Sequence, residues 1–357
     1  MKLQQCYLYN TLRCLPRRSS LFAHTSFYTL HRALFTTKPT SSQASFQPTP
    51  LNTLEDASVN YFRETSFVPE QPAVFPRQHF RHNLPAFERW FRPPSASTAA
   101  QLNTEYLAQH GANAFVPLEL TQSQPAAPTT DSPTQPDNLT FRQFHAPLSL
   151  FLEWMRTAET QPQSARLYLA QCQLTDLPPA LRDDFPTPDI VRLAGKGDVY
   201  DTNVWIGCPP TYTPLHRDPN PNLFVQLAGQ KVVRLLPPSD GQTLFATVRR
   251  QLGQSGGREA AAFRGEEMMQ GRERELLEQA VWGDGPADSG PRYQGYEARL
   301  EAGDGMFIPK GWWHSIKGVG DGVTASVSVC CLVELTSLLT DNAGQLVVPI
   351  ASLNISD

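Results

Sequence analysis

The stretch Thr213-Pro214-Leu215-His216-Arg217-Asp218 brings two potential metal ligands close together. On a β-strand the side chains at i and i+2 point to one face, so His216 and Asp218 can reach the same ion. Far downstream, the segment Ile308–His314 ends in a third candidate, His314. Two histidines and one carboxylate are the ligand set of non-haem Fe(II) sites. The pattern therefore predicts a metal site built from two strands, although three such ligands also suit other divalent metals.

The surrounding segments predict an all-β core with flanking helices. Short apolar runs separated by Gly and Pro turns are typical of a β-sandwich or barrel. The sequence predicts strands at Ala114–Leu120, Arg166–Gln171, Thr202–Gly207, Leu223–Leu227, Lys231–Leu235, Met306–Pro309 and Val323–Val333. Ala228-Gly229-Gln230, which joins the fourth and fifth of these, is typical of a β-hairpin. Leu148–Thr157 has helical periodicity, and we expect it to pack on the outside of a sheet.

Three parts are expected along the chain. Residues 36–56 are polar and contain prolines, which is typical of a linker. Residues 60–160 are expected to form a mixed α/β extension with a flexible loop at 121–138. Residues 161–340 would form the core, interrupted by an insertion at 239–297 whose charged middle part is helical in character. Insertions of this kind often cover a pocket and carry substrate contacts.

The first 54 residues contain six basic residues and no acidic one. Together with many Ser, Thr, Leu and Phe residues, this composition predicts a mitochondrial transit peptide within residues 1–45 and a protein of the matrix. A disordered basic tail without a targeting role is the alternative. The rest of the chain carries 24 basic and 34 acidic residues, so general binding to a nucleic-acid backbone is not expected.

Two further observations concern the surroundings of the protein. No run of 18 apolar residues occurs, so no membrane-spanning helix is expected. Cys172, Cys208, Cys330 and Cys331 lack the spacing of a metal-binding cysteine motif. A matrix location would keep these thiols reduced.

More residues around the ligands match a known pattern. The segments are Tyr168–Gln171, Trp205–Gly207, Thr213–Asp218, Asn222–Gln226, Gly229–Lys231 and Gly303–His314, with a weaker match at Phe67–Pro72. In these segments the sequence resembles the JmjC-domain 2-oxoglutarate oxygenases of the cupin superfamily. The closest similarity is to the small hydroxylase branch that includes factor-inhibiting-HIF. An HxD pair, a lysine at this offset and GDxxxIPxxWWH are together much more specific than an isolated HxD.

The resemblance implies a double-stranded β-helix, or jelly-roll, and a role for each matching residue. His216, Asp218 and His314 would bind Fe(II). Lys231 would pair with the distal carboxylate of the cosubstrate 2-oxoglutarate. Thr213 and Tyr168 would donate hydrogen bonds to that carboxylate, and Asn222 would lie beside the metal-chelating end of the cosubstrate or help to fix the pocket. O₂ would take the open metal position.

One segment departs from the family pattern. Ser328 stands where related enzymes often carry an Asn near the cosubstrate, and Cys330-Cys331 stand where they carry bulkier residues. Smaller side chains at these positions would enlarge the pocket. This departure bears on the substrate class, which stays open, and not on metal binding.

Several functions are compatible with this pattern. The resemblance implies hydroxylation of a protein side chain. Demethylation of N-methyl-lysine or N-methyl-arginine uses the same chemistry, and an RNA-nucleoside hydroxylase is a further enzyme alternative. A non-catalytic, cupin-like metal-binding or interaction protein is the alternative from another class. Singly, each residue could also be structural, since a histidine beside a Trp pair is more often packed than a ligand. The oligomeric state is not predicted.

Overall fold

The computed structural model describes residues 45–92, 99–124, 138–195, 197–254, 256, 266–283, 292–331, 339–340 and 346–347. The expected transit peptide up to residue 44 and residues 125–137 of the expected loop lie outside these ranges. In the described part of the chain, no helix is long and apolar enough to cross a membrane.

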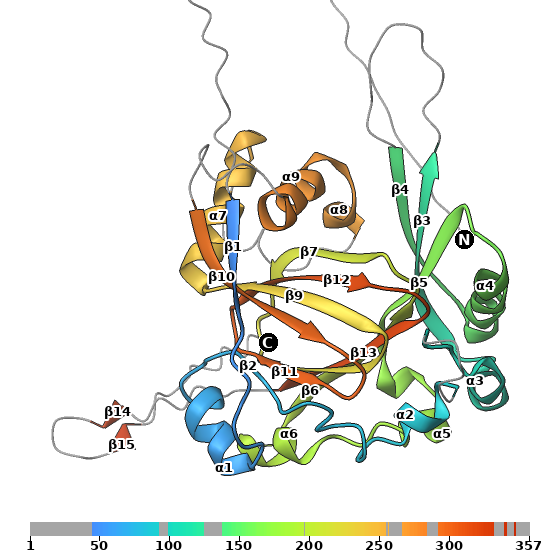
Figure 1. Ribbon diagram of the computed structural model, residues 1–357, viewed down its shortest axis with the longest axis horizontal. Helices are drawn as coiled ribbons and strands as arrows, with labels where there is room; N and C mark the ends of the chain where they lie inside the picture. The colour runs from blue at the N-terminus through green and yellow to red at the C-terminus, as the bar shows by residue number, and fades with distance from the viewer. Residues whose placement is uncertain are drawn as a thin grey trace, which may run out of the picture. The chain divides into compact units, whose positions relative to one another are not determined.

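Two β-sheets form the core of the protein (Figure 1). The eight-stranded sheet has the order β2 (Ala73–Val74), β11 (Gly305–Ile308), β8 (Asn222–Ala228), β13 (Thr324–Cys331), β6 (Val199–Gly207), β5 (Ala165–Gln173), β3 (Phe115–Gln124) and β4 (Asn138–Pro147). The five-stranded sheet has the order β1 (Ser45–Pro50), β10 (Arg292–Leu300), β9 (Gln230–Leu236), β12 (Trp313–Val319) and β7 (Thr211–Arg217). A short pair, β14 (Leu339–Thr340) and β15 (Leu346–Val347), forms a separate ribbon. The two large sheets confirm the predicted jelly-roll fold.

Strand β8 shows how one sequence serves both faces of the larger sheet. All of its seven residues are buried. Leu223, Val225 and Leu227 belong to the core that the sheet shares with the helices. Phe224 alternates with them and packs with residues of β9, β10 and β11 in a cluster between the two sheets. The continuous apolar run in the sequence therefore reflects a strand that is covered on both faces.

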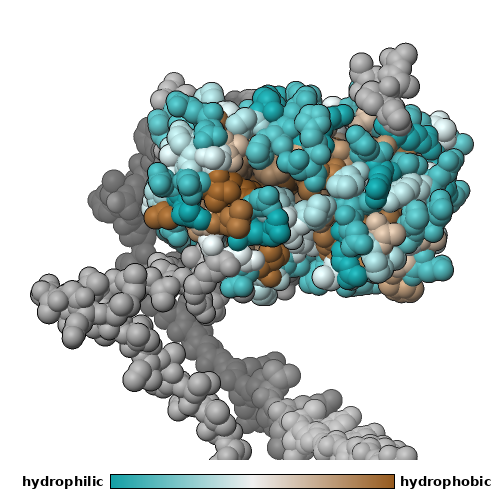
Figure 2. Space-filling model, turned by 90° about the horizontal axis from the view of Figure 1, so that it is seen from below, coloured by the Kyte–Doolittle hydropathy of each residue, from teal (hydrophilic) through white to brown (hydrophobic). Residues whose placement is uncertain are grey.

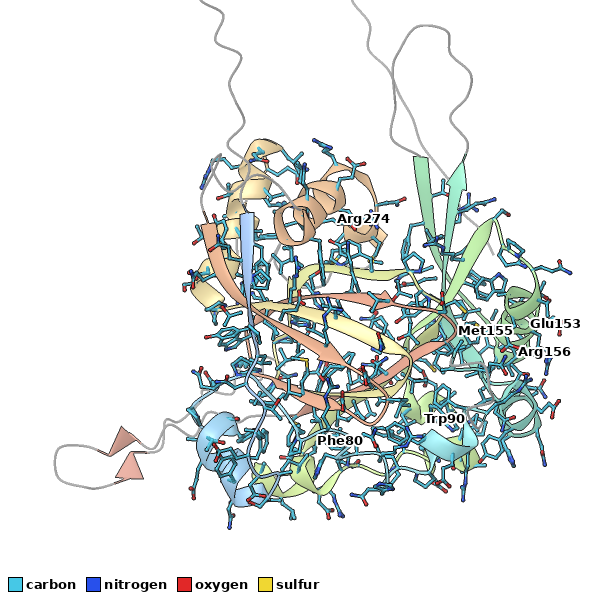
Figure 3. All side chains as sticks on the ribbon, in the orientation of Figure 1. Phe80, Trp90, Glu153, Met155, Arg156 and Arg274 are labelled. Atoms are coloured by element: carbon cyan, nitrogen blue, oxygen red, sulfur yellow. The ribbon has the colours of Figure 1, made fainter. Side chains whose placement is uncertain are left out.

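Helices cover the outer face of the larger sheet. They are α1 (Val59–Phe62) with a π-turn at Arg63–Phe67, α2 (Ala86–Arg89), α3 (Thr104–Gly111), α4 (Leu148–Thr160), a 3₁₀ turn at Leu174–Asp176, α5 (Pro179–Arg182) and α6 (Asp189–Ala194). Helix α4 buries residues at helical spacing, among them Leu148, Leu152 and Met155. Figure 3 shows Met155 directed toward the sheet, with Glu153 and Arg156 on the outer side of the helix. This position confirms the prediction for Leu148–Thr157.

The described residues of the expected insertion form three helices and the first part of a core strand. Helices α7 (Pro238–Gln251), α8 (Glu266–Met269) and α9 (Gly271–Trp282) lie beside the smaller sheet (Figure 1). Leu244 and Leu277 from these helices pack in one cluster with Leu215 and Trp313, which belong to β7 and β12. Residues 292–297, at the expected end of the insertion, are part of β10. The insertion therefore braces the two strands that carry the proposed metal ligands.

The predicted linker is wrong at its C-terminal part. Ser45–Pro50 forms β1, which pairs with β10 in parallel. Phe46 is buried, and a side chain at Gly295 would lie 2.3 Å from its ring. The sequence of this strand is mostly polar, and Phe46 is its one buried apolar side chain. Gly295 leaves the space that the Phe46 ring occupies. Likewise, residues 121–124 of the expected loop extend β3 instead.

The predicted hairpin at Ala228-Gly229-Gln230 is also wrong. Strand β8 pairs with β11 and β13, whereas β9 pairs with β10 and β12. The turn is a corner through which the chain leaves one sheet and enters the other. Gly229 has a φ of +63°, and a side chain there would lie 2.4 Å from the carbonyl oxygen of Val323. Glycine is therefore needed here because two chain segments cross closely. Local turn patterns instead associate a glycine between two strands with a hairpin.

Apolar side chains are mostly in the interior. The described surface, seen from below in Figure 2, is mainly hydrophilic with scattered hydrophobic areas. Exposed large hydrophobic residues include Val68, Phe115 and Tyr200. Single exposed side chains of this kind are ordinary on protein surfaces.

Candidate active site

The three predicted ligands lie together at one end of the smaller sheet. His216 is in β7, Asp218 follows directly after this strand, and His314 is the second residue of β12. The two histidines are cross-strand neighbours. Their Nε2 atoms lie 3.8 Å and 3.6 Å from the two carboxylate oxygens of Asp218. All three ligand atoms lie within 4.8 Å of one another, and they form the one such cluster among the described residues.

Backbone carbonyls orient both imidazole rings. His216 Nδ1 is 2.8 Å from the carbonyl oxygen of Pro214, and His314 Nδ1 is 3.1 Å from that of Trp312. A carbonyl oxygen only accepts, so Nδ1 carries the hydrogen and the Nε2 lone pair faces the cluster. Burial and the neighbouring His314 lower the pKa of His216 and so favour its neutral form. A neutral imidazole that presents Nε2 to the cluster, as His216 does, fits a divalent metal.

A glycine turn positions the carboxylate. The backbone amide of Gly311 donates to the carbonyl oxygen of Asp218 at 3.1 Å. Gly311 has a φ of +76°, a conformation that favours glycine. The Lys310-Gly311 pair of the sequence motif therefore connects the chain after β11 to the chain after β7.

A β-bulge brings Thr213 to the same side as His216. Strict alternation would place residues three apart on opposite faces of a strand. The register between β7 and β12 shifts, however, between the pairs His314–His216 and Ile316–Thr213. The extra residue in β7 reverses the alternation, and Thr213 and His216 line one cavity. The sequence alone gave no sign of this bulge.

Lys231 is a buried cation in the same cavity. It is 3% exposed. Its ammonium donates to Ser326 Oγ at 2.7 Å and to the Tyr168 hydroxyl at 3.2 Å. Among the described residues, no carboxylate lies within 4 Å of it. Burial lowers the pKa of Lys231 to about 7, so the site has room for an anionic partner that the described side chains do not supply.

The remaining predicted residues line this cavity of about 100 Å³. Tyr168, Thr213, Asn222, Lys231 and Ser328 share it with the three metal ligands. Asn222 Oδ1 is buried and has no hydrogen-bond partner among the described residues. The buried amine of Lys231 is what a bound carboxylate requires, whereas the Asn222 oxygen, which only accepts, suits a donor such as a metal-bound water. The residues present therefore fit both a metal ion and 2-oxoglutarate.

The vicinal cysteines point in different directions. Cys330 lines the cavity, whereas Cys331 belongs to the core under the helices. Burial, and then the negative charge of Asp218, raise the pKa of Cys330 to about 12. In the metal-free protein the Cys330 side chain is therefore a neutral thiol.

Two residues that contribute to the site were not predicted. Ser326 accepts the shorter hydrogen bond of Lys231. Alternation along β13 from Ser328 could have found it, since i and i+2 share a face. Glu119 is buried opposite Tyr168 across β3 and β5, and burial raises its pKa to about 7. No local sequence signal distinguishes Glu119, because its position depends on the pairing of distant strands.

Comparison with known proteins gives matches over most of the chain. A family model described as a cupin-like domain matches residues 60–330. "Lysine-specific demethylase JMJ30" of Arabidopsis thaliana is 32% identical over 181 residues, which cover 51% of this chain and 36% of that protein. "Lysine-specific demethylase 8" of Xenopus tropicalis is 24% identical over 272 residues, which cover 76% and 51%. "Jumonji C domain-containing protein 5" of Drosophila melanogaster is 24% identical over 280 residues, which cover 76% and 58%. The chain thus spans between about a third and three fifths of the length of these relatives.

Proposed function

Because the chain belongs to the cupin-like JmjC family of oxygenases, we propose that it is an Fe(II)- and 2-oxoglutarate-dependent enzyme that hydroxylates a protein side chain. One observation carries the cosubstrate assignment. A buried lysine without a described carboxylate partner lies in the same cavity as two histidines and an aspartate. A cupin that only bound a metal would have no use for this costly buried amine.

Each side chain has a defined task in this proposal. His216, Asp218 and His314 would hold the iron. Lys231, with the Tyr168 hydroxyl beside it, would hold the distal carboxylate of 2-oxoglutarate. When bound, iron and 2-oxoglutarate supply the activation of O₂, with decarboxylation of the cosubstrate to succinate and CO₂.

The walls of the cavity limit the access of water. Trp205, Phe224 and Ile316 line it together with the polar residues. The ring of Phe224 lies 5.4 Å from the Lys231 ammonium. Apolar walls of this kind strengthen the pairing of Lys231 with a carboxylate, since the local dielectric is low.

Demethylation of a protein side chain is the second candidate, and the names of two relatives support it. Two of the relatives carry the name lysine-specific demethylase. Hydroxylation of an N-methyl group gives an unstable hemiaminal, so one site geometry serves both outcomes. Mass spectrometry separates them: a hydroxylase product gains about 16 Da, whereas a demethylated product loses about 14 Da per methyl group.

The test of the proposed function is cosubstrate turnover. Purified protein with Fe(II), ascorbate and 2-oxoglutarate should release succinate, and His216→Ala should abolish the release. Incubation of both proteins with mitochondrial extract should then reveal a mass change that depends on the active enzyme. If the wild-type protein binds metal but neither binds 2-oxoglutarate nor releases succinate, the non-catalytic alternative holds.

We also propose that the protein acts in the mitochondrial matrix. Support comes from the basic, acid-free first 54 residues of the sequence. A fluorescent reporter fused to residues 1–50 should enter mitochondria, and a variant with the six basic residues replaced by Gln should stay in the cytosol. Cytosolic retention of the unmodified fusion would refute the proposal.

A further inference from the structure

A second cavity adjoins the metal cavity. It has a volume of about 110 Å³, which is similar to that of the metal cavity. Both cavities are lined by Tyr168, Trp205, Thr211 and Thr213. The second one, called the flank cavity below, therefore lies directly behind the side chains that surround Lys231.

The flank cavity lies where the two sheets do not pair. Strand β7 is an edge strand of the smaller sheet, and the larger sheet continues with β5, β3 and β4. Helices α8 and α9 pack against β7, and α8 also packs against β4 (Figure 1). Met269 and Arg274 from these helices line the cavity, and Figure 3 shows Arg274 above β7. The insertion therefore roofs the flank cavity.

This cavity extends from the surface to the cosubstrate pocket. Arg166 and Pro210, which are exposed, line its outer part. Tyr168, whose hydroxyl accepts a hydrogen bond from Lys231, lines its inner part. The metal cavity has its own opening on another side, where Gln171 is exposed and the Asp218 side chain is 24% exposed. The two cavities are therefore neighbours with separate openings, and the side chains that line both of them lie between the flank cavity and Lys231.

The lining of the flank cavity suits an anion. Arg166 contributes a cation at the outer part, and its guanidinium donates to the carbonyl oxygen of Pro210 at 3.2 Å. Arg274 lies over the Tyr212 ring at 4.8 Å and pairs with Glu278 at 3.3 Å, so its charge is partly compensated. Glu119 is the one carboxylate among the described residues of the lining, and burial raises its pKa to about 7, so that it is only partly ionised near neutral pH.

Hydroxyl groups also line the flank cavity. They belong to Tyr212 and to the threonines Thr121, Thr211 and Thr213. Hydroxyl donors beside an exposed arginine are suitable partners for a carboxylate.

We propose that the flank cavity is a passage through which 2-oxoglutarate reaches Lys231 and succinate leaves. The proposal rests on the proposed function, since it assumes that Lys231 holds 2-oxoglutarate. A polypeptide seated over the metal must cover the opening next to Asp218. The flank cavity then allows the exchange of the small dicarboxylates while the protein substrate stays bound.

A bulky side chain placed in the flank cavity tests whether the cavity is a route for 2-oxoglutarate. Thr121 lines this cavity but not the metal cavity. Such a side chain raises the free-energy barrier for both entry and exit of 2-oxoglutarate. The free-energy difference between the bound and the free state stays the same. Thr121→Phe should therefore slow association and dissociation of 2-oxoglutarate by about tenfold or more, with an unchanged equilibrium Kd. Thr121→Val, which keeps the volume, should leave both rates unchanged.

The rates are measured by stopped-flow tryptophan fluorescence on Fe(II)-loaded protein without oxygen, with 2-oxoglutarate and with succinate as probes. Gln171→Phe, which narrows the metal-side opening, is the matched comparison and should leave the rates as they are. If Gln171→Phe slows binding and Thr121→Phe does not, the dicarboxylates enter past the metal and the proposal is overturned. Failure of the wild-type protein to bind 2-oxoglutarate at all would instead refute the proposed function.

A charge variant provides an independent check. Arg166→Gln removes the exposed cation at the outer part of the cavity, and it should lower the association rate of 2-oxoglutarate by about threefold to tenfold at low salt. The dissociation rate should change little, because a rim charge acts mainly on encounter. Arg142→Gln removes an exposed arginine of β4 that is outside the lining. Equal effects of both variants would show that only the net charge matters, against the proposal.

Discussion

At the scale of single residues, Lys231 has the environment that most narrows the chemistry of the site. Its ammonium has two hydroxyl acceptors and lies near the Phe224 and Tyr168 rings, at 5.4 Å and 5.9 Å from their centroids. Hydroxyls do not compensate for the loss of water around a charge as a carboxylate does. In the ligand-free protein the buried Lys231 ammonium therefore destabilises the fold. An anionic ligand would form a stabilising ion pair with it.

Replacement of this lysine should separate stability from binding. Lys231→Met removes a buried amine but keeps a long apolar side chain. We expect the free energy of unfolding of the ligand-free protein to stay the same or to rise by about 1–3 kcal/mol. The affinity for 2-oxoglutarate should fall by about a hundredfold or more, since the carboxylate would be buried without its cation. Urea denaturation and titration calorimetry measure the two effects.

Lys317→Met is the matched control for this experiment. Lys317 lies in the neighbouring strand β12, and its ammonium pairs with Glu278 at 2.7 Å near the surface. Its replacement should not change the affinity for 2-oxoglutarate. An equal loss of affinity in both variants, or unchanged affinity in Lys231→Met, would contradict the assigned role of Lys231.

The affinity for 2-oxoglutarate should depend on pH through the same residue. Burial lowers the pKa of Lys231 from 10.5 to about 7 in the ligand-free protein. Only the protonated amine pairs with the carboxylate, so above about pH 7 each pH unit should raise the Kd by up to tenfold. Binding should also take up a proton, which calorimetry in buffers of different ionisation enthalpy detects. A Kd that is constant from pH 7 to pH 9 would refute this.

The stability of the ligand-free protein should show the opposite trend. Between pH 7 and pH 10 the unfolded chain keeps a proton on Lys231 that the folded chain releases. The contribution of Lys231 to the free energy of unfolding therefore rises with pH between pH 7 and pH 10. The Lys231→Met variant should lack this contribution.

At the scale of elements, the sequence predicted most strands but not all of their partners. Short apolar runs located β5, β6, β8, β9 and β13, because burial requires apolar residues wherever the strand lies. Pairing is decided by contacts between distant segments, as the corner at Gly229 illustrates. The bulge in β7 is a second example, since it depends on the register with β12.

Strand β6 controls the position of Tyr168 through a glycine. A side chain at Gly207 would lie 2.3 Å from Tyr168 Cδ2. Gly207→Ala should therefore displace the Tyr168 ring and weaken 2-oxoglutarate binding by about tenfold, the size of one lost hydrogen bond to a charged group. In a double-mutant cycle, Gly207→Ala should add little to Tyr168→Phe when both are measured by calorimetry. Full additivity would show that the glycine acts through another contact.

At the scale of the whole molecule, the candidate metal site joins two distant parts of the chain. His216 and Asp218 come from the β7 end, and His314 comes from the start of β12, beyond the inserted helices. An ion that binds only this assembled site stabilises the folded state by about 2.7 kcal/mol at a hundredfold excess over its Kd. Fe(II) or Mn(II) should therefore raise the melting temperature by several degrees, and EDTA should reverse the increase. His216→Ala should retain the melting temperature of the metal-free protein but lose the response to metal.

The sequence by itself singled out the three candidate metal ligands and the lysine, and it determined the class of fold. Ligand chemistry restricts these positions to a few residue types, and alternation along a strand connects His216 to Asp218. Only the tertiary structure decided that Thr213 joins them through a bulge, that Ser326 and Glu119 flank Lys231 and Tyr168, and that inserted helices roof a second cavity. These features arise where segments far apart in the chain meet. Their geometry depends on strand pairing and register, which local sequence patterns do not encode.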